Sequence, residues 1–466
     1  MTEKNQYGQV TVGAILRRVY RILHSKLVGV LIILAMAVLS LIGTLVMQAP
    51  VSHRTDPEGY ARWLPNAQEK LGGWATIFDY LGFFNMWSSP LFLGVTVLLA
   101  LSIIACTTHR LPELIKKTLH PRIHVSDRFF SNAQYRAAIP TERATEESLK
   151  LVRDALCSRR FRLVVDDQDP SRLYADRFRY GPFGTVIAHA AFVVILAAFG
   201  VSAFTGFETN LDIAIGEKAE VGNGTELSVE AVSFDDVYDP QGRPTDYVSH
   251  LIVRKGSEKV AEQDVRVNTP IVVDGVRFHQ ASFGVAAAIT VTDDKGAEIV
   301  KKAVPLKWTS DDGMNVVGRL DLPDRGLEII VATPASGQRT ANVGTATIEV
   351  YQVSSDKKIG AATVDQGTQA QVGPVKVTFE REQRFTAITV RNDPGTLWMW
   401  VGSVLLIIGM VMTFGFRHRR IWVRVTNDTI YVASVEQQDT LLDREFRQLV
   451  QDISQSSSVN KEGTHA

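Results

Sequence analysis

Cysteine is nearly absent from this sequence, which has only Cys106 and Cys157 among 466 residues. The two form no CxxC pair of the kind that carries thiol redox chemistry, and no Cys/His cluster with metal-ligand spacing is present. Residues 206–393 contain no cysteine at all, so this long segment can form no disulfide. The sequence therefore gives no support to a thiol oxidoreductase or to a disulfide-stapled domain.

The sequence also has no excess of charge of either sign, with 50 Lys and Arg against 50 Asp and Glu. A nucleic-acid-binding surface usually needs a basic excess, so no nucleic acid is expected as a partner. An internal repeat of the kind that many transporters have is missing, and the apolar runs hold few polar residues. A transporter for some other substrate is therefore the least favoured function.

Long apolar runs are what the sequence does contain. Four of them carry no Asp, Glu, Lys or Arg: Leu27–Gln48, Leu91–Thr108, residues 183–205 and Pro394–Phe416. As helices rising about 1.5 Å per residue, they can cross a hydrocarbon core of about 30 Å. We expect four transmembrane helices, the first an uncleaved anchor because it is longer than a secretory signal. Arg110 and Pro112 are expected to end the second.

The third run contains one ionisable side chain, His189. An imidazole at membrane depth has to find a partner within the protein, and such residues often mark functional sites. It lies about 9 Å of helix from the start of its run, by the rise per residue. Two interpretations stay open on these residues alone: a histidine that carries out a function, and one that only packs by a hydrogen bond against a neighbouring helix.

Basic flanks set the expected orientation, because cytoplasmic segments next to membrane spans carry the Lys and Arg excess. Such residues precede the first run and are frequent in 109–182 and after the fourth run. Both termini are therefore expected in the cytoplasm, as in a multi-pass protein of the bacterial inner membrane. The arginines of the cytoplasmic segment are expected to face anionic membrane lipid.

The predicted fold class is an α+β polytopic membrane protein, with four transmembrane helices, a large antiparallel β-rich extracytoplasmic domain and a small α/β cytoplasmic domain. The expected order is a cytoplasmic N-terminal arm (1–26), a first span (27–48), extracytoplasmic surface helices (49–83), a second span with its lead-in (84–108), the small cytoplasmic domain (109–182), a third span (183–205), the β-rich domain (206–393), a fourth span (394–416) and a cytoplasmic tail (417–466).

Local patterns predict the elements inside these segments. The arm should form a short amphipathic helix. The small domain should be a β-α-β-β unit, with Thr145 as the N-cap of a helix that buries Leu149, Val152 and Leu156. The tail should contain two short strands and a helix, with disordered final residues.

Alternating apolar and polar residues in 206–393 predict an antiparallel sandwich or open barrel. His250 and His279 are the only histidines of this segment and fall in separate predicted strands, so a metal site is not expected there.

Several stretches resemble the ResB (CcsB) family of System II cytochrome c biogenesis, from about Arg21 to Leu449. The most specific are SPLFLGVTVLLALSIIACTTHRLP, YGPFGTVIAHAAFVVILAAFG, PTDYVSHLIV, NTPIVVDGVRFHQASFG and DPGTLWMWVGSVLLIIGMVMTFGFRHRRIWVRV. Together they are far more specific than any one alone.

The resemblance implies a subunit that works with a CcsA/ResC-type membrane partner to move haem b across the membrane and present it to apocytochrome c. His189 matches the family's third-span histidine, an axial ligand of haem iron, and a neutral imidazole nitrogen suits that role. The resemblance also names a membrane-tethered thioredoxin-like reductase as a further candidate partner. The tryptophan-rich haem-handling motif of the partner subunit is missing, so the chain is expected to be a haem lyase subunit without catalytic residues of its own.

One departure from the family concerns residues 280–284. The family usually has Gln-Ser-Ser-Tyr-Gly, whereas this chain has Gln280, Ala281, Ser282, Phe283 and Gly284. The stretch is expected to form a strand and turn. The main alternative function is a non-catalytic membrane receptor or scaffold whose β-rich outer domain binds an exported partner.

Overall fold

The computed structural model describes residues 12–50, 57–241, 244–310, 313–334, 344–353, 355, 357–435 and 440–458. The predicted disorder of the final residues, 459–466, lies outside these ranges. The chain forms two units: unit 1 comprises residues 1–47, 77–200 and 395–466, and unit 2 comprises residues 48–76 and 201–394.

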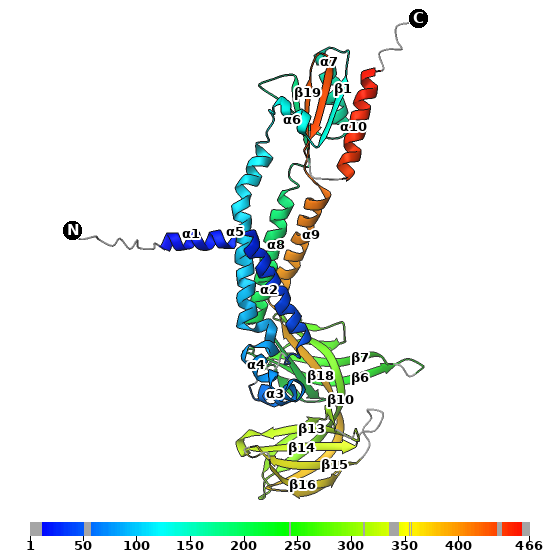
Figure 1. The fold of residues 1–466 in the computed structure, drawn as a ribbon. Helices are drawn as coiled ribbons and strands as arrows, with labels where there is room; N and C mark the ends of the chain where they lie inside the picture. The colour runs from blue at the N-terminus through cyan, green and yellow to red at the C-terminus, as the bar shows by residue number, and fades with distance from the viewer. Residues whose placement is uncertain are drawn as a thin grey trace, which may run out of the picture. The chain divides into compact units, whose positions relative to one another are not determined.

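Four long apolar helices lie where the sequence predicts the four membrane spans. They are α2 (Lys26–Leu45), α5 (Pro90–Leu119), α8 (Phe183–Thr205) and α9 (Thr396–Gly415), each long and apolar enough to cross a bilayer. In unit 1, α5, α8 and α9 run alongside one another (Figure 1).

The helix end predicted at Arg110 and Pro112 is wrong. Helix α5 continues past Arg110 and keeps Pro112 in its interior before it ends at Leu119. A proline removes one backbone donor, which weakens a helix locally without always ending it. The added turns are polar and charged, with a Glu113–Lys117 ion pair of 2.8 Å, so they suit water better than lipid.

Shorter helices lie before the second span. The predicted amphipathic helix of the arm is present as α1 (Val12–Leu23). The surface helices expected before residue 90 are α3 (Pro57–Leu71) and α4 (Trp74–Tyr80), followed by the 3₁₀ helix η2 (Phe83–Ser88).

A five-stranded antiparallel sheet in unit 1 joins two distant parts of the sequence. Its order is β1-β20-β19-β3-β2, from strands β1 (Tyr135–Pro140), β2 (Arg162–Val165), β3 (Arg172–Arg177), β19 (Arg419–Val425) and β20 (Thr429–Ser434). Helices α7 (Thr145–Ser158) and α10 (Thr440–Ser458) contribute to the core on one face, and α6 (Asp127–Asn132) contributes to a smaller cluster.

The sequence did not reveal that the tail strands complete the small domain. β19 separates β20 from β3, so residues 109–182 and 417–466 build one sheet. Helix α7 buries Leu149, Val152 and Leu156 as predicted, but its N-cap is Ala144 instead of Thr145.

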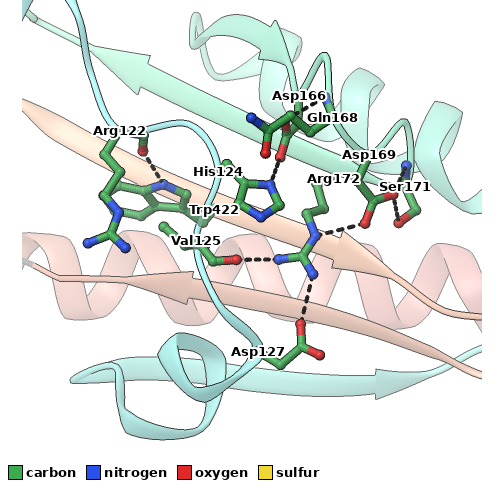
Figure 2. A network of polar contacts seen from close by, with 10 residues as sticks. All are labelled: Arg122, His124, Val125, Asp127, Asp166, Gln168, Asp169, Ser171, Arg172 and Trp422. Atoms are coloured by element: carbon green, nitrogen blue, oxygen red, sulfur yellow. Dashed lines mark hydrogen bonds and ion pairs between the residues drawn. The ribbon is translucent and has the colours of Figure 1, made fainter.

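A polar network fastens the segment after α5 to this sheet (Figure 2). His124 Nδ1 lies 2.6 Å from a carboxylate oxygen of the buried Asp166. Arg172 bonds to Asp169 at 2.8 Å and Asp127 at 2.7 Å, and Trp422 Nε1 donates to the Arg122 carbonyl at 3.0 Å. The segment that follows α5 is therefore held by side chains from both parts of the chain that form the sheet, residues 109–182 and 417–466.

Unit 2 is built on two long paired strands, β10 (Val276–Thr292) and β18 (Val375–Asn392). They belong to a six-stranded sheet with β4 (Phe207–Ala214), β9 (Ile271–Val273), β11 (Glu298–Pro305) and β17 (Gln369–Val372). A four-stranded sheet contains β5 (Lys218–Glu220), β6 (Leu227–Tyr238), β7 (Pro244–Lys255) and β8 (Glu258–Val265). A five-stranded sheet contains β12 (Trp308–Thr309), β13 (Asn315–Leu322), β14 (Leu327–Pro334), β15 (Thr345–Gln352) and β16 (Lys357–Asp365).

The long strands β10 and β18 contribute side chains to two hydrophobic cores. One half packs with β5–β8 around Phe278 and Ile388, and the other packs with β13–β16 around Ile289 and Phe379 (Figure 1). The predicted antiparallel, β-rich character of residues 206–393 is thus confirmed. The turn predicted at 280–284 is wrong: β10 runs straight through this stretch, with a register shift between Gln280 and Ser282.

Candidate functional site

Helix α8 packs closely on α9 through small residues. A Cβ added at Gly184 would lie 2.5 Å from the Gly409 carbonyl oxygen, and one added at Gly409 would lie 2.6 Å from the Ala188 nitrogen. Ala191, one turn further along, is fully buried. Small residues let membrane helices pack this closely. The stripe of Gly184, Ala188 and Ala191 on α8 therefore fixes the rotation of this helix about its axis.

His189 follows Ala188 and faces α5 instead. Its Nδ1 lies 2.8 Å from the Oγ1 of Thr107, and the imidazole is half-buried. Successive helix residues point in directions that differ by about 100°. Because Ala188 faces α9, the side chain of the next residue, His189, points toward α5. The backbone packing of α8 thus positions the histidine.

Thr107 is the residue that sequence inspection missed. Other hydroxyls of the spans, including Thr44, Thr96 and Thr413, donate to a carbonyl of their own helix four residues earlier. Such local bonds are the ordinary use of hydroxyls in membrane helices. The bond of Thr107 crosses between helices and joins positions 82 residues apart, which no local pattern reveals.

The second ring nitrogen of His189 has no hydrogen-bond partner among the residues that the structure describes. No group of three or more His, Cys, Asp or Glu side chains that could hold a metal ion is found within those residues either. Within its apolar helix, His189 therefore has one fixed nitrogen, Nδ1, and one available nitrogen, Nε2.

Two other histidines lie near the same end of α5 but on a different side. The rings of His109 and His24 stack with centroids 4.1 Å apart, and His24 Nδ1 also lies 2.7 Å from the Tyr20 carbonyl oxygen. Since His109 is two positions after Thr107, its direction differs by about 200°. This pair therefore ties α1 to α5 and stands apart from His189.

The two histidines of residues 206–393, His250 and His279, lie on different strands. His250 on β7 lies 2.8 Å from Asp264 and 3.0 Å from Glu262, and these hydrogen bonds raise the pKa of its imidazole. His279 lies on β10, where burial lowers its pKa. Carboxylate partners favour a protonated His250, which is a poor form for binding a metal.

The protein-family comparison decides the affiliation of the chain. The model of the family described as "ResB-like family" matches residues 27–447. The chain belongs to the ResB-like family. The match covers all four long helices, unit 2 and most of the small sheet domain, so the resemblance found in the sequence is confirmed.

Curated relatives of this family member align over most of its length. The cytochrome c biogenesis protein CcsB of Microcystis aeruginosa is 23% identical over 435 residues, which cover 87% of this chain and 88% of the relative. CcsB of Synechococcus elongatus is 25% identical over 370 residues, which cover 76% of this chain and 75% of the relative.

Among solved structures, the cytochrome c haem lyase CcmF matches at 13% identity with a TM-score of 0.22. The match covers 73% of this chain and 43% of CcmF, and it is too distant to support a statement about fold or function.

Proposed function

We propose that this ResB-like protein is a subunit of a System II cytochrome c synthase that moves haem b across the membrane and presents it for attachment to apocytochrome c. The relatives are named for cytochrome c biogenesis. Haem is the substrate here, and a CcsA/ResC-type membrane subunit is the partner that completes the enzyme.

The observation that carries the proposal is the arrangement of His189. Its Nδ1 is engaged by Thr107 at 2.8 Å, and an imidazole whose Nδ1–H donates to an oxygen has its free lone pair on Nε2. A partner at one nitrogen that fixes the tautomer and ring orientation is usual for metal-binding histidines. Haem iron accepts such a ligand.

The proposed topology places both termini and the small sheet domain in the cytoplasm, and residues 49–83 and 206–393 outside. Strands from 135–177 and 419–434 share one sheet, so these two segments must lie on the same side of the membrane. Residues 206–393 connect α8 to α9. If both helices cross, this connection must lie on the opposite side.

A cytochrome maturation assay tests the proposal. The chain is expressed with its partner subunit in a host without its own maturation system, and covalent haem is measured on an exported cytochrome c. We expect His189→Ala to abolish maturation while the protein stays in the membrane. His109→Ala is the matched control, because that histidine lies on another side of α5, and it should retain activity.

Two outcomes would contradict the proposal. One is normal maturation by membrane-inserted His189→Ala protein, which would leave His189 with a packing role only. The other is maturation by this chain without any partner subunit, which would refute its assignment as an incomplete enzyme.

A further inference from the structure

A cavity of about 220 Å³ lies within unit 2, between the β12–β14 region and the long strands β10 and β18. Pockets for small molecules are usually larger, about 300–1,000 Å³. A cavity of this size is at the small end for a ligand site and has room for a side chain.

One carboxylate of the cavity, that of Glu382, has an unsatisfied oxygen. Its Oε2 is buried and has no hydrogen-bond partner among the described residues. Thr333, which is 1% exposed, lines the same cavity. A buried acceptor without a donor is unfavourable, and more so when it is charged, so a donor from a ligand would remove this cost.

The charges around the cavity favour a cation. Lys307 is already bonded to Asp212 at 2.8 Å, and its ammonium lies 4.8 Å from the centre of the Trp308 ring. The positive charge of Lys307 is therefore already balanced by Asp212 at the cavity wall. Glu382 contributes a second carboxylate, which leaves the charged side chains of the lining with an excess of one negative charge.

The remaining walls suit an alkyl chain. Val285, Leu306 and Val316 line the cavity together with the aromatic rings of Trp308 and Phe385. Methylene groups pack on aliphatic walls while a charged head reaches a polar partner, and aromatic faces attract ammonium groups. Apolar walls that lead to a carboxylate match a primary ammonium at the end of a short alkyl chain.

We propose that this cavity binds the ammonium group of a lysine side chain from a polypeptide partner. Strand β12, which contributes Trp308 and Thr309 to the lining, stands at the edge of its sheet in the strand order. An extended peptide can add to such an edge and direct alternate side chains toward a neighbouring pocket. This inference is independent of haem delivery.

The proton balance of Glu382 supplies a further check. Burial raises the pKa of its carboxyl. The ammonium pairs with the ionised carboxylate, so binding should weaken as the pH falls through that raised pKa and strengthen above it.

The test uses the full chain in detergent and ligand-observed NMR titration with Nα-acetyl-lysine methylamide. The matched probe is Nα-acetyl-norleucine methylamide, which lacks the ammonium. We expect the lysine probe to bind at least 10-fold more tightly, and E382Q, which keeps the shape of the side chain, to remove this preference. E380Q is the control, because Glu380 is a neighbour on β18 that pairs with Lys301 at 2.7 Å outside the cavity.

Equal binding of the two probes to the unmodified chain would overturn the proposal, and this comparison needs no variant to fold. An unchanged preference in E382Q would also overturn it. If the unmodified chain binds neither probe, the cavity holds solvent only and the proposal is wrong.

Discussion

Replacing Thr107 separates the two roles that His189 could have. Thr107→Val removes the hydroxyl that lies 2.8 Å from His189 Nδ1 and keeps a β-branched side chain of nearly the same shape. A hydrogen bond between side chains of membrane helices contributes about 0.6 kcal/mol on average and about 1.7 kcal/mol at most. If His189 only packs, a small loss of stability of this size is the whole effect.

A larger effect on haem is expected if His189 is a ligand. Losing the partner that orients a metal-binding histidine typically lowers metal affinity about 10–100-fold, which corresponds to about 1.4–2.7 kcal/mol. We therefore expect haem affinity to fall at least 10-fold in Thr107→Val, with little change in stability. Thr107→Ser, which keeps the hydroxyl, is the matched control and should bind haem like the unmodified protein.

Haem titration of the detergent-purified complex, followed by Soret absorbance, measures this affinity, and thermal unfolding of the same samples measures stability. Haem binding by Thr107→Val within twofold of the unmodified complex would contradict the proposed role of Thr107. Equally weak haem binding by Thr107→Ser and Thr107→Val would also contradict it, because the hydroxyl would then not be the cause.

Three further predictions concern the small sheet domain and topology. The exposed Cys157 should react with a membrane-impermeant maleimide only after cells are opened; labelling of intact cells would reverse the proposed orientation. Deleting 417–466 removes β19 from the middle of the sheet and should make 120–177 protease-sensitive, whereas deleting 459–466 should not; equal resistance would show that the tail is dispensable. Burial raises the pKa of Asp176, but His418 and Arg162 outweigh it and lower that pKa to about 2. A depressed pKa gives stability that is present above about pH 4 and lost as the pH falls toward 2. Asp176→Asn should therefore cost about 2 kcal/mol at neutral pH and progressively less in acid, measured by hydrogen exchange of β3 amides; a cost independent of pH would refute this.

The elements that the sequence predicts well are those defined by local pattern. Charge-free runs predict the four long helices, and alternating apolar and polar residues predict the strands of unit 2. Both patterns depend only on residues that are consecutive in the sequence. His189 is found for the same reason, as the one ionisable group in an apolar run.

The relations that depend on distant pairing are not predictable in this way. Thr107 can be recognised as a partner of His189 only once α5 packs against α8. The sequence of β19 has a strand pattern, but it does not show that β3 and β20 are the neighbouring strands. Pro112 suggested a helix end because one lost hydrogen bond is a local cost, whereas the continuation of α5 places its polar end beside the sheet domain that holds the following segment.

Spectroscopy of the purified complex tests the central claim, that His189 ligates haem iron, most directly. We expect a Soret band in the unmodified complex, its loss in His189→Ala, and its partial return when imidazole is added, because a free imidazole can enter the space left by the side chain. His109→Ala should keep the band. An unchanged Soret band in His189→Ala would contradict the account.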